Sequence, residues 1–414
     1  MRRSSTWILA IAVLTATALI VACSTKYSSS SNGLIVVPVQ GGQGGIQNQN
    51  APIMQSFSLD LGNGHVSQIN NVNGPPTAGL PTSVVLDPAG AFAYVIVLQN
   101  AAVPGSVTGI QAFSIASDGK LGSGTTPVSE PNPVALAIDS AGKFLFVANA
   151  TANGAAGSVD VFSIGSGGSL TLAGSTTLPL QTGGGTPSPS ALAVTRTVYP
   201  TQFAVCSNGQ TPPSSENLYV ADVNNDVLLN YSVSSAGALT LLPTATGNGV
   251  ITGASPAGVA VDPCNRFAFV TNATSNNVSA YTICNLPSAT SGNCTSVDFH
   301  LQEAPLSPYS AGDVPGPIAV DPYGSFVYAV DTGSNQVSAY RISASTGSLT
   351  AEGTSATNVG PNSIAIRGDD TWVFVANTTS ANLSQYAITP ATGALNPITT
   401  PVNTLNLPSG VAVK

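Results

Sequence analysis

The sequence of 414 residues is 43% hydrophobic but only 7% charged, whereas soluble domains usually carry about 25% charged residues. Its 42 glycines and 30 prolines stay below the share that is typical of disordered chains, so the chain can bury a core. A net charge of −8 argues against a nucleic-acid partner, because such binding depends on Lys and Arg at the phosphates. The scarcity of charge and the abundance of Val, Thr, Ser, Asn and Gly predict an all-β fold.

The first 23 residues have the order of an export signal. Two arginines precede an apolar run from Trp7 to Ala22, and Cys23 follows. Ile20-Val21-Ala22-Cys23 resembles the lipobox of bacterial lipoproteins, in which the cysteine is lipidated. An uncleaved membrane anchor is the alternative, but the run has about 16 residues and a span needs about 20. We predict a signal peptide over residues 1–22, export, and attachment through Cys23 to the membrane of the bacterial cell envelope, at its periplasmic face or in the outer membrane.

Residues 23–33 are rich in Ser without an apolar period, which predicts a flexible tether. From residue 34 onward an internal repeat dominates. Each copy begins with a proline and an apolar triplet, and usually has an Asp six positions after the proline. The seven anchor prolines are Pro81, Pro133, Pro189, Pro256, Pro315, Pro361 and Pro408. Their spacing of 46 to 67 residues is close to the length of a four-stranded propeller blade, with insertions in the middle copies.

Each anchor is followed by a second apolar run that usually ends in Asn or Asp, then a third run, and in most copies a glycine-containing turn into a fourth. Four short strands per copy predict a propeller blade. The seventh copy stops after one strand, and the strands predicted near residues 34–59 lack an inner strand. We expect Pro408–Lys414 to supply it, which closes the ring and leaves no open sheet edge. The prediction is a seven-bladed β-propeller over residues 34–414, with four antiparallel strands per blade.

The Asp that follows six positions after an anchor proline opens a turn of the form Asp-Pro-x-Gly, as at Asp87 and Asp321. Asp and Pro at these positions are typical of type I turns, so we interpret these carboxylates as turn caps. In two copies Arg367 and Lys414 stand in their place. We expect Arg367 to pair with Asp321, and Lys414 with Asp87, across blade boundaries.

Four cysteines follow the predicted cleavage point: Cys206, Cys264, Cys284 and Cys294. An even number in an exported chain suggests disulfides. Cys284 and Cys294 bracket a turn-rich segment that one bridge would close, which would leave Cys206 with Cys264, although spacing alone does not fix the connectivity. There is no CxxC sequence and no His near any of the four, so we expect neither a metal site nor a cofactor.

The run Phe269-Val270-Thr271-Asn272 and its variants resemble the YVTN propeller repeat, and the blade pattern is similar to the seven-bladed lactonase-like family that includes 6-phosphogluconolactonase-type enzymes. In the lactone-hydrolysing members, the resemblance implies a His and an Arg beside the proline that opens an inner strand, and a Glu just after a second strand. This sequence departs from that pattern. Its openings read Ser255-Pro256-Ala257, Val314-Pro315-Gly316 and Gly360-Pro361-Asn362.

The loops after the second strands and before the inner strands share one face of a propeller, where ligands usually bind. We predict a mouth there that is rich in carboxylates and amides; it includes Glu130, and its candidate ligand-binding residues are Asn149, Asp222, Asp226, Asn272, Glu303, Asp313, Asp331 and Asn377. Each of these side chains also suits a turn. Neither His65 nor His300 has a motif around it, so no catalytic residue is assigned.

Two functions stay open at this point. The absence of the His, Arg and Glu set favours a lipid-anchored binding or scaffold module, a monomer with a glycan or protein partner at the mouth. The resemblance favours the alternative, a lactonase-type hydrolase of a sugar lactone with a relocated site. The sequence does not decide whether the protein is an enzyme.

Overall fold

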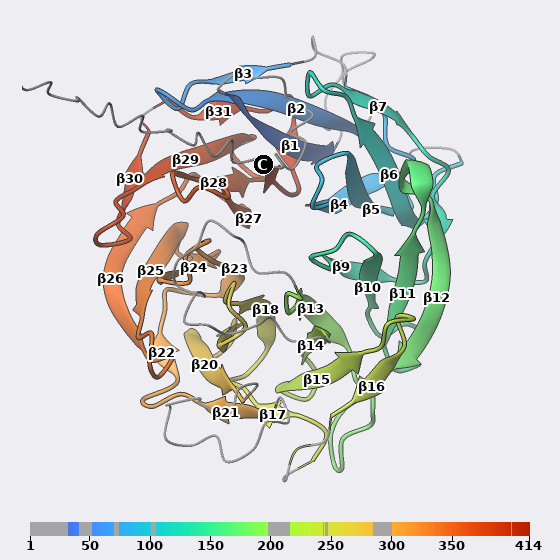
Figure 1. Ribbon diagram of the computed structural model, residues 1–414, viewed down its shortest axis with the longest axis vertical. Helices are drawn as coiled ribbons and strands as arrows, with labels where there is room; N and C mark the ends of the chain where they lie inside the picture. Colours follow the sequence, from blue (N-terminus) through green and yellow to red (C-terminus); the bar gives the residue numbers. More distant parts are fainter. Residues whose placement is uncertain are drawn as a thin grey trace, which may run out of the picture.

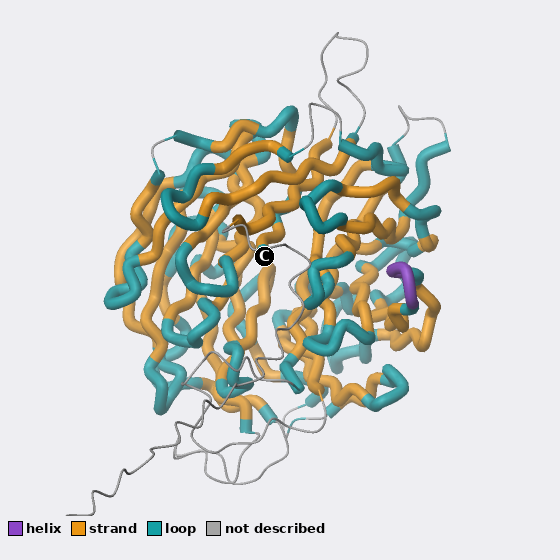
Figure 2. Tube along the Cα trace, turned by 45° about the horizontal axis from the view of Figure 1, so that its top comes forward, coloured by secondary structure: helices purple, strands orange, loops and turns teal. Residues whose placement is uncertain are grey.

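The computed structural model describes residues 32–40, 52–69, 74–100, 105–197, 216–242, 244, 247–284, 300–398 and 400–414. The predicted signal peptide, Cys23 and most of the predicted tether lie outside the described residues, as do Cys206 and Cys294. In the described part of the chain, every element is a strand except one short 3-10 turn at Ser166–Gly168 (Figure 2). None of the helical structure described there is long and apolar enough to cross a membrane.

Seven antiparallel sheets are arranged in a ring about a central axis (Figure 1), as predicted. Blade 1 contains β1 Asn32–Gln40, β2 Ile53–Asp60, β3 Val66–Gln68, β32 Leu407–Pro408 and β33 Ala412–Val413. Blade 2 contains β4 Leu80–Leu86, β5 Phe92–Leu98, β6 Gly109–Ile115, β7 Leu121–Gly124 and β8 Val128–Ser129. Blade 3 contains β9 Pro133–Ile138, β10 Phe144–Asn149, β11 Ser158–Ile164 and β12 Leu170–Thr177. Blade 4 contains β13 Pro189–Val194, β14 Glu216–Asp222, β15 Val227–Val233, β16 Leu239–Leu241 and β17 Val250–Ile251.

The remaining three blades follow in chain order. Blade 5 contains β18 Pro256–Val261, β19 Phe267–Asn272, β20 Asn277–Ile283, β21 Leu301–Glu303 and β22 Tyr309–Ser310. Blade 6 contains β23 Pro315–Val320, β24 Phe326–Asp331, β25 Gln336–Ile342 and β26 Leu349–Ala356. Blade 7 contains β27 Pro361–Ile366, β28 Trp372–Asn377, β29 Asn382–Ile388, β30 Leu395–Pro397 and β31 Val402–Asn403.

The ring closes as the repeat predicts. The C-terminal strands β32 and β33 pair antiparallel with β1, with Val39 opposite Pro408 and Ile35 opposite Val413. They thus form the inner strand of blade 1, and β1 has hydrogen-bonded neighbours on both sides. This arrangement removes the open edge that a ring of seven unjoined blades would leave.

The second strand of each blade lies between the inner strand and the third strand of its sheet. In blades 3 to 7 every residue of this strand is buried. The reason is that its sheet has a neighbouring blade on each face, which requires a continuous apolar run in place of alternation. The core accordingly consists of seven clusters, each between two adjacent blades.

The glycines of the outer turns bring these blades close together. Gly168 has φ +76°, and a Cβ there would lie 2.5 Å from the Phe92 ring of the preceding blade. Gly347 has φ +72°, and a Cβ on it would likewise lie 2.5 Å from the Phe267 ring of the preceding blade. Only glycine combines this left-handed backbone with such a close approach. The Gly-containing turns in the repeat therefore fix blade-to-blade packing as well as the hairpins.

The predicted ion pair between Arg367 and Asp321 is wrong. Arg367 pairs with Asp369 in its own turn, because that carboxylate is only two residues away. Lys414 does reach the next blade, where its Nζ donates to the Ala89 carbonyl. Asp321 caps its turn, as interpreted from the sequence, and accepts from the backbone N–H groups of Ser325 and Phe326 at 2.6 Å each.

Candidate functional site

The inner strands of the seven blades surround the axis of the ring, and we call the region along this axis the channel. We name its two ends from the direction of the inner strands. At the upper end the inner strands begin and the second strands finish, so that Pro256 lies opposite Asn272. At the lower end the inner strands finish and the Asp-Pro-x-Gly turns follow. The predicted mouth belongs to the upper end.

Five of the predicted mouth residues end second strands and are buried, with at most 2% of the residue exposed: Asn149, Asp222, Asn272, Asp331 and Asn377. Each of the five makes side-chain hydrogen bonds within the described blades, although one oxygen each of Asn149, Asn272 and Asp331 (Oδ1) has no hydrogen-bond partner there. Asp222, for example, accepts from the Ser188 N–H at 2.9 Å and from the Asn224 N–H at 3.2 Å. The structure therefore uses these side chains to hold the turns, and their ligand-binding role stays a prediction.

Asp226 connects two blades. Its backbone is left-handed, with φ 53°, and its Oδ1 accepts from the Ser255 N–H at 2.7 Å, directly before the anchor proline of the next blade. Asn276 and Asn335 repeat this contact with Val314 and Gly360, at 2.9 Å each. We call these three contacts the blade latches, because each one joins the turn after a second strand to the start of the next inner strand.

The last two predicted mouth residues lie in different places. Asp313 is exposed at the upper end, and its charge is one of the factors that raise the pKa of Asp331, after burial. Glu303 is exposed on β21, the outermost strand of blade 5, beside Tyr281. Strand β21 lies at the outside of the ring (Figure 1). The structure thus brings Asp313 and Asp331 together and leaves Glu303 away from the channel.

A carboxyl pair lies beneath the upper end in blade 3. Glu130 is 5% exposed, and the Asn149 Nδ2 donates to its Oε2 at 2.6 Å and to Asp160 Oδ2 at 3.3 Å. Burial raises the pKa of Glu130 to about 7, and the Asp160 charge acts in the same direction, against the hydrogen bond from Asn149. Glu130 stands three residues before the anchor proline of blade 3. The equivalent residues of blades 5 and 6 are Gly253 and Gly312.

The lower end of the channel is hollow. A cavity of about 740 Å³ lies there, with lining residues from all seven blades; we call it the lower cavity. Its wall is a ring of aliphatic side chains, the fifth residue after each anchor proline: Leu86, Ile138, Val194, Val261, Val320, Ile366 and Val413. All seven are only partly buried, because their strands end at open space.

Charged side chains stand around this ring. Asp87 and Asp139 cap turns, and each accepts two backbone N–H groups through Oδ1. Arg196 also lines the cavity, and desolvation lowers its pKa while the Asp262 charge opposes that effect. The sequence reasoning did not place Arg196 at a site. The repeat does contain a signal. Arg196 is seven residues after the anchor proline Pro189, and the equivalent residue in the five other copies that have one is Pro, Ser or Gly.

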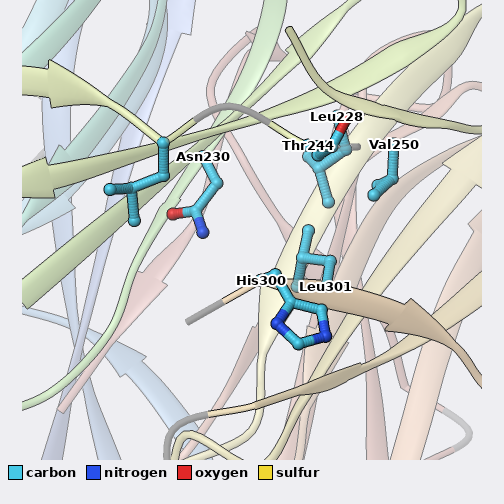
Figure 3. Close-up of a pocket in the computed structure, with 7 residues that line it drawn as sticks. Leu228, Asn230, Thr244, Val250, His300 and Leu301 are labelled. Carbon is cyan, nitrogen blue, oxygen red and sulfur yellow. The ribbon is translucent and has the colours of Figure 1, made fainter. Parts of the chain in front are cut away.

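The two histidines line pockets outside the channel. His300 lies between blades 4 and 5, facing Asn230, Thr244 and Val250 across a small pocket of about 180 Å³ (Figure 3). His65 lines an open cleft of about 520 Å³ between blades 1 and 7. Neither pocket includes a second acidic or basic side chain among its described lining residues.

The structure describes two of the four cysteines for which disulfides are predicted. Cys264 and Cys284 are buried, 4% and 0% exposed, while the proposed partners Cys206 and Cys294 lie outside the described residues. The pairing remains a prediction. Among the described side chains, no three of His, Cys, Asp or Glu gather as a metal site would require.

Comparison with known proteins identifies the family of this propeller. The family description "Lactonase, 7-bladed beta-propeller" matches residues 43–414, which is most of the chain. The chain belongs to this lactonase family. Among curated protein sequences, none matches it.

Solved structures with the same architecture include members named for lactone chemistry. A Bacteroides fragilis protein described as a candidate 6-phosphogluconolactonase is 17% identical, with a TM-score of 0.68 over 94% of this chain and 99% of that one. The Pseudomonas aeruginosa periplasmic gluconolactonase is 18% identical, with a TM-score of 0.66 over 92% of this chain and 99% of that one. A similar protein of Bacteroides uniformis is 14% identical, with a TM-score of 0.69 over 93% of this chain and 100% of that one. At these identities the likeness shows the fold.

Proposed function

We propose that this lactonase-family propeller hydrolyses a sugar lactone, with Glu130 at the upper end as its acid–base group. The observation that carries the proposal is the carboxyl pair. Lactone hydrolysis needs a group that takes a proton from the attacking water. A carboxyl whose pKa is raised to about 7 is a stronger base than an ordinary glutamate and is still partly ionised at neutral pH.

In the proposed reaction, the Glu130 carboxylate accepts a proton from water as the water oxygen bonds to the lactone carbonyl carbon. The ring C–O bond then breaks, and the proton passes to the leaving alkoxide, so that the product is a hydroxy acid. Asn149 donates to Glu130 at 2.6 Å and would hold the carboxylate in one orientation. The relatives named for gluconolactonase and 6-phosphogluconolactonase activity support the substrate class.

The test is turnover of glucono-δ-lactone and other aldonolactones by the purified protein. We expect kcat/KM to increase as the pH rises through about 7, because the base must be ionised, and Glu130→Gln to lower it at least a hundredfold. Glu352→Gln is the matched control, since Glu352 pairs with Arg341 on the blade exterior. The proposal fails if no lactone is turned over, or if Glu130→Gln retains the wild-type rate and pH profile.

The second proposal is a binding module without catalysis. One observation favours it: the described inner-strand openings at Pro256, Pro315 and Pro361 carry no Arg or His beside the proline, so a lactone oxyanion would lack cationic donors there. The partner would be a neutral glycan or a protein. Saturable glycan binding without lactone turnover would decide for it.

We further propose that the protein is exported and anchored by a lipid at Cys23, and that it acts as a monomer in the cell envelope. The order of residues 1–23 supports this proposal, and one structural relative is named as periplasmic. Detergent-phase partitioning of the protein from cells, lost in Cys23→Ala, tests the anchor. Equal partitioning of both forms would contradict it.

A further inference from the structure

The lower cavity contains one cation, Arg196, whose guanidinium is not paired with any described residue. Among the described residues, no carboxylate or carbonyl accepts a hydrogen bond from the Arg196 guanidinium. The other two cations of the cavity differ: Arg367 pairs with Asp369, and Lys414 donates to Ala89. The carboxylate whose charge raises the pKa of Arg196 belongs to Asp262, and Asp262 already forms an ion pair with Arg266 at 2.8 Å. Arg196 is exposed and lines the cavity, so a ligand in the cavity can reach it.

The backbone of Arg196 is held from the next blade. The Asn265 Oδ1 accepts from the Arg196 N–H at 2.8 Å, and the Asn265 Nδ2 donates to the Arg196 carbonyl at 2.7 Å. Asn265 is fully buried and has φ 57°. This two-point contact fixes the peptide from which the Arg196 side chain extends, so that on binding only the side chain has to be ordered.

Both members of this contact depart from the repeat. The equivalents of Arg196 are Pro88, Ser140, Pro263, Pro322 and Gly368, none of them charged. The equivalents of Asn265 are Gly90, Gly142, Gly324 and Asp370. Blade geometry alone therefore requires neither residue. The unusual cation and the unusual amide that holds it occur together at one blade boundary.

We propose that Arg196 is the anion-binding end of a ligand site in the lower cavity, and that the ligand is an organic carboxylate with an apolar body. A guanidinium binds a carboxylate through two parallel hydrogen bonds. The aliphatic ring around the channel supplies the apolar wall, and a volume of about 740 Å³ lies in the range of small-molecule sites. The capping oxygens of Asp87 and Asp139 are occupied by turn N–H groups. The site lies at the opposite end of the channel from the carboxyl pair and does not depend on the proposed lactonase activity.

Calorimetric titration with octanoate tests the site, with 1-octanol as the uncharged probe and inorganic phosphate as the anion without an apolar body. We expect octanoate to bind once per chain and to bind at least tenfold more weakly to Arg196→Gln. Arg341→Gln, which removes an exterior cation paired with Glu352, should leave the affinity unchanged. Octanol and phosphate should each bind at least tenfold more weakly than octanoate to the wild-type protein.

A second variant tests the positioning of the guanidinium. Asn265→Gly restores the residue found in three other blades and tolerates the left-handed backbone. It should weaken octanoate binding three- to fivefold while a wild-type melting transition shows an intact fold. The proposal is overturned if octanoate does not saturate, if Arg196→Gln binds as tightly as wild type, or if phosphate binds as tightly as octanoate, which would make this a site for anions of any kind.

Discussion

Leu34 and Lys414 exchange two backbone hydrogen bonds: the Leu34 N–H donates to the Lys414 carbonyl at 3.0 Å, and the Lys414 N–H donates to the Leu34 carbonyl at 2.8 Å. These bonds join the two ends of the propeller within one sheet. Blade 1 thus depends on residues from both ends of the propeller.

Removal of residues 407–414 should therefore lower the melting temperature by more than 10 °C. The deletion exposes the backbone of β1 as an unpaired edge and removes Val411, which is buried in the cluster between blades 7 and 1. Calorimetry and light scattering measure the melting and the expected aggregation. As the control, Lys414→Ala keeps the strand pairing and should melt within a few degrees of wild type. A truncated chain with an unchanged transition would show that the closing strand is dispensable.

The carboxyl pair predicts a pH dependence of stability. The pKa of Glu130 is about 7 in the folded protein and near its ordinary value of 4.5 when unfolded. The folded state thus binds this proton more tightly, and the stabilisation present below about pH 4.5 is lost as the pH rises to 7. Relative to Glu130→Gln, which stays neutral, the wild type should lose on the order of 3 kcal/mol across this range. Urea denaturation at several pH values measures the difference, and parallel curves would refute the assignment.

The blade latch at Asp226 can be separated from a ligand role. Asp226→Gly removes the acceptor for the Ser255 N–H and should destabilise the protein by about 1 to 2 kcal/mol. Asp226→Asn keeps the acceptor, as Asn276 and Asn335 do in the following blades, and should be nearly neutral. Ala381→Gly is the control for backbone strain, because Ala381 has φ 51° and no side chain with which to form a latch; it should stabilise the protein.

Chemical denaturation compares these three variants. If Asp226→Gly stabilised the protein as much as Ala381→Gly does, the latch would have no structural role, and the predicted ligand role of Asp226 would become the better explanation of the residue.

Two neighbouring glycines test blade-to-blade packing. Gly167 and Gly168 have nearly the same φ, +73° and +76°, but a Cβ at Gly167 meets nothing within 4 Å while one at Gly168 meets the Phe92 ring. Gly167→Ala should cost about 1 kcal/mol for the left-handed backbone. Gly168→Ala should cost about 2 to 4 kcal/mol, because the blades must also separate. Equal unfolding free energies for the two variants would show that the ring moves aside freely.

Much of the fold was predictable because its determinants are local. The anchor prolines open the inner strands, and the apolar runs that follow them become second strands whose length and burial follow from a blade on each face. Glycine and Asp-Pro turns end the strands at the predicted places. The count of seven and the closure by residues 408–414 follow from these signals alone.

The candidate sites were less predictable. Glu130 was one of several acidic residues in the predicted mouth, and what distinguishes it in the structure is that Asn149 donates both to it and to Asp160. Asn149, Asp222 and Asn272 lie buried at the ends of second strands, which the sequence did not indicate, and their ligand-binding role stays a prediction. Arg367 was expected to reach Asp321 but pairs with Asp369, which is closer.

By itself, the sequence determined that this chain is a seven-bladed propeller, because strand length, turn type and repeat spacing depend on residues that are near one another in the chain. Only the tertiary structure decided that the lower end of the channel has a cavity and that Arg196 lines it. Arg196 is held by Asn265, 69 residues further along the chain, and the lower cavity is lined by all seven blades. The repeat marks Arg196 as an unusual residue, but the cavity around it is a property of the closed ring.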